Sequence, residues 1–269
     1  MNKPLVSVVM ATFNESPEQI TQSIQSILAQ TMQNFELLLI DDSTKAETVD
    51  TIDSLAQKDA RIKVIRSSSR IGFVPALNIG LKQAQGEYIA RMDGDDVSLP
   101  NRFELQTSYL NSNPNITVVG GAIDIINGKG DITSHRDYAA TTKKVKLFSL
   151  MRNPIAHPTA MIRKNIVGQG FLYDETFLKA EDLELWLRLM KNGYKIVNVR
   201  DTILLFRVQG SLADKRVGDN FRYNYKARKK NFSWRSPFWS LTSLLISKAY
   251  TLLPKKIVSA VYKVENKNE

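Results

Sequence analysis

Four short apolar segments alternate with amphipathic helical segments along the first hundred residues, and few folds accommodate such an alternation. The strand-like segments are residues 5–11, 36–41, 62–66 and 87–92. After the first of them, Ser16 provides an N-cap, Pro17 a first-turn proline and Gln19 a capping-box partner. This β-α-β-α-β-α-β order predicts an α/β fold with a Rossmann-like, mostly parallel central sheet flanked by helices.

Two more helices are expected among these segments, one capped by Thr44 and Glu47 and one over residues 75–85. Beyond Pro100 the pattern becomes mixed. It predicts helices at 101–111 and 180–192 and strands at 116–123, 159–163, 194–199 and 203–208. Because no repeat or low-complexity linker interrupts the chain, we expect one domain over residues 1–212. Its two halves would be residues 1–97, with the alternating pattern, and residues 98–212, with the mixed pattern.

Acidic residues follow two of the predicted parallel strands. Asp41 and Asp42 end the second strand, and Asp93 and Asp95 end the fourth. Ligands of such sheets bind beyond the carboxyl ends of the strands, so both pairs are expected on one edge. Carboxylates there can hold Mg²⁺ or Mn²⁺ bridging to a substrate diphosphate, whereas a solvated acidic turn is the alternative for an isolated Asp-x-Asp.

The segments VSVVMATFNE, FELLLIDDS and NIGLKQAQGEYIARMDGDDVSLPNRFELQ occur in this order. Together they resemble family 2 glycosyltransferases of the GT-A fold, particularly bacterial enzymes that build capsular, exopolysaccharide or lipopolysaccharide chains. The resemblance spans about residues 4–210. It implies transfer of one sugar from a nucleotide-sugar, a UDP-sugar by expectation, to a glycan acceptor. The Gln-x-x-Arg-Trp motif of processive synthases does not occur, which favours transfer of a single residue.

Carried over by position, the resemblance implies a donor site at the ends of the first, second and fourth strands. Asp42 would contact the nucleotide base, and Thr12 and Asn14 would border the nucleotide. Asp93 would lie near the ribose and the sugar, and Asp95 would bind Mn²⁺ or Mg²⁺. For Asp42 and its neighbour, a helix-capping acidic turn is the alternative.

One position departs from the family pattern. Asn78 matches the usual Asn before the acidic strand, but Leu77 stands where relatives commonly have Arg. The basic partner of the diphosphate or base would then be Arg70 or Arg91. Some relatives also place a metal-binding His after the strand at 203–208, where this chain has Gln209.

The acceptor side is expected near residues 153–192. Glu181 and Asp182 begin a helix whose apolar stripe faces inward, and acidic residues at a helix N-terminus are favourable in themselves. The resemblance implies that Asp182 is the catalytic base, with Glu181 beside it. A base is needed because an acceptor hydroxyl is a poor nucleophile until its proton is withdrawn, and one displacement would invert the anomeric carbon. His157 could hydrogen-bond backbone or substrate, or be a packed structural histidine.

The last segment, residues 213–269, differs in charge from the rest. From Asp214 onward it has 13 Lys or Arg against 4 Asp or Glu, a net charge of +9 out of +10 for the chain. Basic and aromatic residues alternate over 215–235, a pattern also found in nucleic-acid-binding proteins. Residues 236–263 add interrupted apolar residues, so an amphipathic helical tail on an anionic membrane fits better than nucleic acid, and a helix packed on the domain is the alternative.

The N-terminal apolar run is too short for a signal peptide or a membrane span, and the chain has no cysteine. We therefore expect a cytoplasmic protein. The basic tail would place it on the inner face of the cell membrane, a position suited to a lipid-linked acceptor.

Two other enzyme classes share parts of the pattern. DGDDV also fits the nucleophile motif of haloacid-dehalogenase-like metal-dependent phosphatases, although that motif normally ends the first strand. A sugar nucleotidyltransferase would share the nucleotide-binding fold, but a Gly-rich phosphate loop should follow its first strand, and ATFNESPEQ has no glycine.

Overall fold

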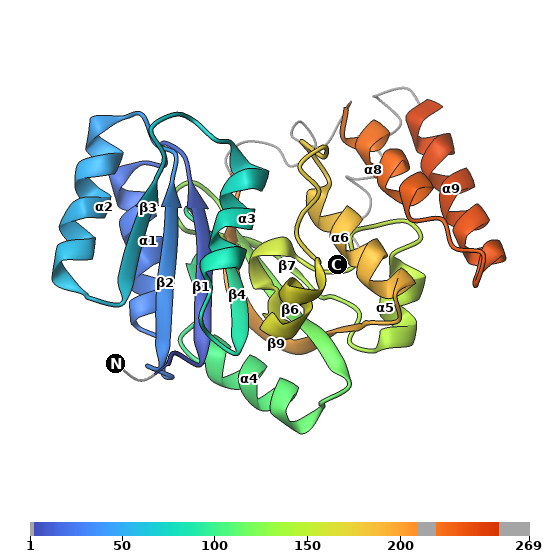
Figure 1. Cartoon of the computed structure of the whole chain (residues 1–269), viewed down its shortest axis with the longest axis horizontal. Coiled ribbons are helices and arrows are strands. Elements are labelled where there is room, and N and C mark those ends of the chain that lie inside the picture. The colour runs from blue at the N-terminus through green and yellow to red at the C-terminus, as the bar shows by residue number, and fades with distance from the viewer. Residues whose placement is uncertain (1–2, 209–218, 253–269) are drawn as a thin grey trace.

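Nine strands of the described residues form one sheet that runs through the molecule (Figure 1). The computed structural model describes residues 3–208 and 219–252. The strand order is β3-β2-β1-β4-β8-β6-β9-β5, and β7 pairs with β6. The strands are β1 (Val6–Thr12), β2 (Phe35–Asp41), β3 (Ile62–Arg66), β4 (Tyr88–Asp93), β5 (Val97–Ser98), β6 (Ile116–Ile126), β7 (Ile132–Arg136), β8 (Met161–Arg163) and β9 (Lys195–Arg207).

The sheet is parallel in its first half and mixed in its second. Strands β3, β2, β1 and β4 are parallel neighbours, as the alternating pattern predicts. Strand β8 is antiparallel to both β4 and β6, and β9 is parallel to β6 and antiparallel to β5. Thr12 and Asp41 are register partners, and so are Ala11 and Asp93, so the acidic strand ends meet at one edge.

Helices cover both faces of the sheet because side chains alternate along each strand. On one face, Val8 and Leu37 pack with α1 (Pro17–Leu28), α2 (Ala46–Lys58) and α4 (Arg102–Ser112). On the other, Val9 and Leu38 pack with α3 (Phe73–Gln83) and α6 (Glu181–Lys191). The core is therefore two apolar layers separated by the sheet.

The N-terminus of α1 is capped by its own residues, whereas that of α2 is capped by a residue from another segment. The predicted capping box of α1 is confirmed, since the side chains of Ser16 and Gln19 each accept from the other's backbone N–H. The predicted cap of α2 is wrong: its N-cap is Lys45, with no side-chain hydrogen bond. The Asn14 side chain satisfies this end instead, because its Oδ1 accepts the N–H groups of Thr44 and Lys45 at 2.8 and 2.9 Å.

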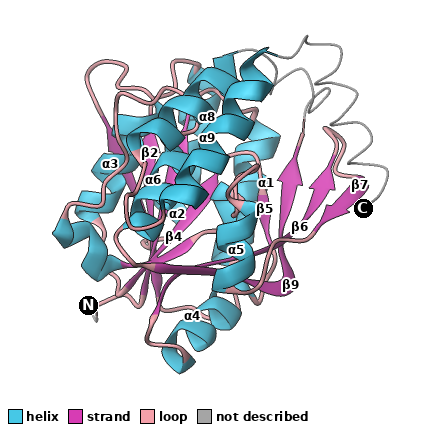
Figure 2. Ribbon diagram, turned by 90° about the vertical axis from the view of Figure 1, so that its right-hand side faces the viewer, coloured by secondary structure: helices cyan, strands magenta, loops and turns pink. Residues whose placement is uncertain are grey.

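Two helices of the last segment pack beside α6. In Figure 1, α8 (Asp219–Lys230) and α9 (Pro237–Leu252) lie next to each other at the end of the molecule remote from β3, and Figure 2 looks onto this end. Ala227 of α8 is fully buried in a small cluster with Phe177 and Leu183. A short helix, α5 (Thr142–Phe148), contacts α9 through a hydrogen bond from Trp239 Nε1 to the Lys146 carbonyl at 3.3 Å. No helix within 3–208 or 219–252 combines the length and the apolar character that crossing a bilayer requires.

Candidate active site

The acidic turn after β4 brings three carboxylates together. One oxygen from each of Asp93, Asp95 and Asp96 lies within 4.8 Å of the others. Gly94 permits this turn to approach β1, because a Cβ there would lie 3.0 Å from the Thr12 methyl group and 3.1 Å from the Glu15 carboxyl carbon. The turn is therefore held against the end of β1 by close packing that a larger residue would disturb.

Arg207, the last residue of β9, fixes the turn from the opposite side. Its backbone N–H donates to Asp96 Oδ1 at 2.8 Å, and its Nε donates to the Asp95 carbonyl at the same distance. Its Nη2 also reaches Gln22 Oε1 of α1 at 2.8 Å. A cation buried beside the carboxylates offsets part of their mutual repulsion, so the turn keeps its shape.

The carboxylate set suits a hard divalent cation. Asp96 is fully buried, and its Oδ2 has no hydrogen-bond partner among the described residues. Burial raises the pKa of the Asp96 carboxyl well above its ordinary range, and Asp93 and Asp95 add to this. A buried oxygen without a partner is costly unless something binds it, and clustered carboxylate oxygens are the ligands that Mg²⁺ and Mn²⁺ prefer. The residues present therefore fit a metal ion.

Arg91 lies beneath the same carboxylates. It is 3% exposed, and its Nη2 pairs with Asp93 Oδ1. Its Nε and Nη1 have no hydrogen-bond partner among the described residues, and its guanidinium lies 5.3 Å from the centroid of the Phe73 ring. Arg91, Asp93 and Phe73 all line the cavity described below, so the guanidinium places a positive charge in its wall.

The predicted nucleotide-binding residues gather at the ends of β1 and β2. Asn14 adopts a left-handed backbone conformation with φ of 61°, which directs its side chain to the start of α2. Both oxygens of Asp42 accept backbone N–H groups, from Ile71 at 2.9 Å and Gly72 at 2.8 Å. Arg70 is 63% exposed and stacks on the Phe13 ring at 3.9 Å. Asp42 thus orders the segment that carries Arg70, next to an exposed aromatic ring.

The side chains of Thr12 and Asp41 are hydrogen-bonded at the carboxyl ends of β1 and β2. The Thr12 hydroxyl donates to Asp41 Oδ1 at 3.2 Å, and Arg66 Nε donates to Asp41 Oδ2 at 2.7 Å. Both residues are buried. Thr12 borders the acidic turn through its methyl contact with the Gly94 position, whereas its hydroxyl is committed to Asp41.

A cavity of about 280 Å³ joins the acidic turn to the predicted acceptor side. Asp93 lies in its wall together with Glu181 and Asp182, although some 90 residues of sequence separate them. His157 also lines this cavity. The structure therefore brings the predicted acceptor-side residues to the same opening as Asp93. Arg70, Asp42 and Asn14 are not among its lining residues and lie farther along the sheet edge.

Asp182 is oriented at the start of α6. Its Oδ1 accepts the N–H of Leu183 at 2.7 Å, and its Oδ2 accepts from Asn153 Nδ2. The N-cap, Ala180, has a left-handed backbone with φ of 57°, which is uncommon for a residue with a Cβ. This sharp entry into the helix turns both acidic side chains toward the cavity.

Glu181, the neighbour of Asp182, is a buried carboxyl with a raised pKa. Burial, and then the neighbouring Asp182 charge, raise the pKa of the Glu181 carboxyl to about 7. His157 Nδ1 lies 3.9 Å from Glu181 Oε1, and its Nε2 is 2.7 Å from the Tyr173 hydroxyl. Burial, and then Arg91, hold the pKa of His157 well below its ordinary value. The imidazole is therefore neutral, and its ring packs edge-on against Tyr173 and Trp186.

Several residues of this site have no signal in the sequence. Arg207 bonds to Asp95, 112 positions away, and Asn153 bonds to Asp182, 29 positions away. No sequence motif predicts such contacts. Arg91 was one of the two predicted basic partners, and the structure places it, but not Arg70, in the wall of the cavity that Asp93 lines. Gln209 lies outside the described residues.

Comparison with known proteins places this geometry in context. Residues 7–171 match the family model described as glycosyl transferase family 2. The amylovoran biosynthesis glycosyltransferase AmsE of Erwinia amylovora is 28% identical, over 98% of this chain and 100% of AmsE. The Escherichia coli protein WfgD is 31% identical over 72% of each chain. It is described as a UDP-Glc:α-D-GlcNAc-diphosphoundecaprenol β-1,3-glucosyltransferase.

The fold also matches a solved structure. The mannosyltransferase PcManGT of Pyrobaculum calidifontis, determined with GDP-Man and Mn²⁺, aligns with a TM-score of 0.68 and 16% identity. The alignment covers 96% of this chain and 73% of PcManGT. The predicted α/β architecture of GT-A type is thereby confirmed.

Proposed function

Because the chain belongs to glycosyl transferase family 2, we propose that it moves one sugar from a UDP-sugar to a hydroxyl of a lipid-linked glycan, with inversion at the anomeric carbon. The observation that carries the proposal is that Asp93 and Asp182 line one cavity. Family membership makes the chain a glycosyltransferase, so the phosphatase and nucleotidyltransferase alternatives are set aside.

Asp182 is proposed as the catalytic base. The acceptor hydroxyl would lose its proton to the Asp182 carboxylate as its oxygen attacks the anomeric carbon, and a positioned carboxylate typically contributes 10²- to 10⁴-fold. Asn153 and the Leu183 N–H hold this carboxylate in place. Glu181, with His157 behind it, would position the acceptor. A single displacement from the face opposite the leaving group inverts the configuration.

The donor is proposed to lie along the edge from Asp42 to the acidic turn. Asp42 would contact the base, Arg70 and Phe13 would flank the nucleotide, and Thr12 and Asn14 would border it. Asp93 would face the ribose and the sugar. Asp95, with Asp93 and Asp96 beside it, would hold Mn²⁺ or Mg²⁺, which would neutralise charge on the departing nucleoside diphosphate. The Arg91 guanidinium in the cavity wall would add a second positive charge near the diphosphate.

UDP as the nucleotide and a lipid-linked acceptor are supported by the reaction for which WfgD is named, and a metal ion by Mn²⁺ in PcManGT. The last segment would hold the enzyme on the cytoplasmic face of an anionic membrane. Its support is the net charge of +9 after residue 213 and three apolar side chains of α9 that are more than half exposed: Phe238, Leu241 and Leu245. We propose residues 213–269 as this membrane-associating segment.

The test combines two variants with one matched control. Asp182→Asn should reduce transfer at least 100-fold while UDP binding in the presence of Mn²⁺ stays unchanged. Asp95→Asn should weaken that binding. Asp201→Asn, at an exposed position of β9, is the control and should behave as the parent. Proton NMR of the product reports the anomeric configuration, and chelation by EDTA tests the metal. Full activity of Asp182→Asn, or activity insensitive to EDTA, would contradict the mechanism.

A further inference from the structure

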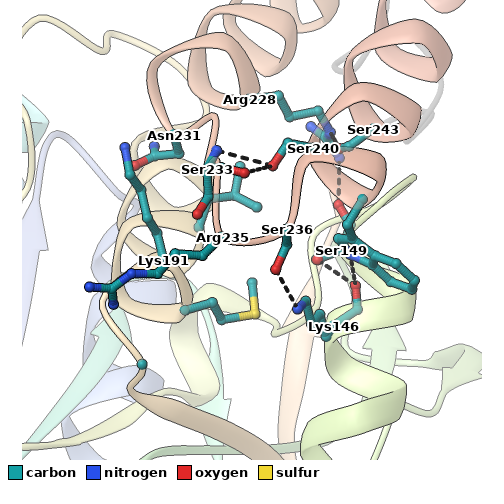
Figure 3. Close-up of a pocket in the computed structure, with 14 residues that line it drawn as sticks. Lys146, Ser149, Lys191, Arg228, Asn231, Ser233, Arg235, Ser236, Ser240 and Ser243 are labelled. Atoms are coloured by element: carbon teal, nitrogen blue, oxygen red, sulfur yellow. Dashed lines mark hydrogen bonds between the residues drawn. The ribbon is translucent and has the colours of Figure 1, made fainter.

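A second cavity, of about 260 Å³, lies between α5, α6, α8 and α9 (Figure 3). It shares no lining residue with the catalytic cavity. Four cationic residues line it: Lys146 of α5, Lys191 of α6, Arg228 of α8, and Arg235 in the turn before α9. None of the described residues that line it is Asp or Glu. Positive charge therefore converges on this cavity from four segments of the chain.

The nearest carboxylates of α6 and its neighbourhood are already paired. Glu184 is fully buried, with Arg188 Nη2 2.9 Å and Lys230 Nζ 3.2 Å from its oxygens. Asp174 pairs with Lys230 as well. Glu184 also accepts from Asn231, but neither Glu184 nor Asp174 lines the cavity. Both acids thus pair with cations, Arg188 and Lys230, that do not line the cavity.

Hydrogen-bond donors accompany the charges. Lys146 Nζ donates to the Ser236 hydroxyl at 3.4 Å, and a hydroxyl that accepts in this way keeps its own hydrogen for another acceptor. Arg228 is 5% exposed, and its Nε, Nη1 and Nη2 donate to the Ser243 hydroxyl at 2.9 Å, the Asn224 carbonyl at 3.3 Å and the Ser149 carbonyl at 3.0 Å. It therefore contributes a fixed positive charge to the cavity wall. Figure 3 shows these side chains around the opening, with Lys191 and Asn231 on the opposite side from Ser149. A fixed arginine, mobile lysines and hydroxyls are the groups that bind phosphate oxygens.

We propose that this cavity is a phosphate-binding site, a property beyond sugar transfer and independent of it. Cations confined to one cavity repel one another, and a ligand with two negative charges removes that repulsion. The ligand is a phosphate group, carried either on an anionic lipid headgroup or free in solution. Trp239, which lies 5.7 Å from Lys146 Nζ, gives the cavity an apolar wall suited to the carbon atoms of a phosphate ester.

The experiment uses the full chain and two probes. Equilibrium dialysis measures binding of radiolabelled inorganic phosphate, and sedimentation measures binding to phosphatidylglycerol vesicles, with phosphatidylcholine vesicles for comparison. Lys191 and Arg235 are exposed, so the variant Lys191→Ala/Arg235→Ala should fold normally and lose at least 10-fold in affinity. Lys143→Ala/Lys229→Ala removes two exposed cations from α5 and α8 outside the cavity and should bind as the parent. Ser240→Glu, which adds a carboxylate to the cavity, should behave as the first variant.

Loss of phosphate binding in the cavity variants alone supports a site for free phosphate. Loss of sedimentation with phosphatidylglycerol in those variants alone supports a lipid headgroup as the source. Equal binding by the parent, cavity variants and control, or absence of binding to both probes, overturns the proposal. Asp182→Asn should bind phosphate as the parent does, so failure of the catalytic proposal is distinguishable from failure of this one.

Discussion

At the scale of single residues, the carboxylates of the catalytic cavity differ because their surroundings differ. Asp93 has the Arg91 guanidinium as its partner, and Asp182 has an amide and a backbone N–H. Glu181 is buried and lies beside Asp182, and both features raise the pKa of its carboxyl to about 7. The pair would therefore supply the proposed base, Asp182, and a second group that titrates near neutrality.

Replacement of Glu181 by Gln should raise stability at alkaline pH. The folded chain binds the Glu181 proton up to a pKa of about 7, whereas the unfolded chain releases it near 4.5. Between these values the folded state holds more protons, so the free energy of unfolding falls as pH rises. Glu181→Gln removes this loss and should be more stable than the parent at pH 8 by about 1–3 kcal/mol, and equal to it near pH 4.

Urea denaturation of metal-free protein at pH 4 and pH 8 measures this difference. Glu47→Gln, at an exposed position of α2, provides the matched control and should show no such dependence. A stability difference for Glu181→Gln that is the same at both pH values would contradict the assignment.

At the scale of secondary-structure elements, strand β9 links the two halves of the site. It was predicted as two strands, at 194–199 and 203–208, and is one strand. The polar residues Arg200 and Asp201 suggested a break. The register instead shifts at this point. Gly120 pairs with Asn198 and Ala122 with Thr202, so three residues of β9 lie opposite one residue of β6. The exposed polar pair is accommodated at this bulge, and the strand continues to the acidic turn.

Removal of the Arg207 side chain should loosen the acidic turn. Arg207→Met would leave Asp95 O and Gln22 Oε1 without their donor, while the backbone N–H to Asp96 Oδ1 would remain. We expect a loss of about 2–4 kcal/mol in the free energy of unfolding and weaker Mn²⁺-dependent UDP binding. Chemical denaturation and calorimetric titration measure the two effects.

Arg200→Met is the matched control for that experiment. It lies on the same strand but is exposed, and it should change neither quantity by more than about 0.5 kcal/mol. Parent-like stability and UDP binding in Arg207→Met would show that the turn keeps its shape without the guanidinium.

Much of the parallel half could be predicted from the sequence because its determinants are local. Strand runs, the Ser16 capping box and the acidic strand ends all act over a few residues, and the structure places each where it was expected. The remainder depends on contacts across long separations. The cap of α2 comes from Asn14, 30 residues earlier, and the strand order beyond β4 follows from pairings that no local pattern encodes.

At the scale of the whole molecule, the basic last segment is partly built into the core. Phe177 and Leu183 pack against Ala227 of α8, and Lys230 pairs with the buried Glu184. One face of α8 is therefore packed on the domain, which was the alternative to membrane binding. The exposed apolar side chains of α9 are the part of this segment proposed to contact the membrane.

A chain that ends at residue 212 should be less stable than the full chain. It would expose Phe177 and Leu183 and leave Glu184 without Lys230, and each buried apolar side chain contributes about 1.5–3 kcal/mol. The midpoint of thermal unfolding, followed by circular dichroism, should fall by several degrees. An unchanged midpoint would instead indicate that residues 213–269 are an independent segment.

Asn78 of α3 is hydrogen-bonded to the segment after η2 (Lys164–Gln169), and this contact restricts how the two halves of the molecule can move when substrates enter. Its amide donates to the Tyr173 carbonyl and accepts the Tyr173 N–H, each at 2.9 Å, while the sheet passes unbroken from β4 to β8. A hinge that swings one half away from the other would have to break both connections. Loops and side chains must therefore admit and enclose the substrates, and solution scattering should give the same radius of gyration with and without UDP.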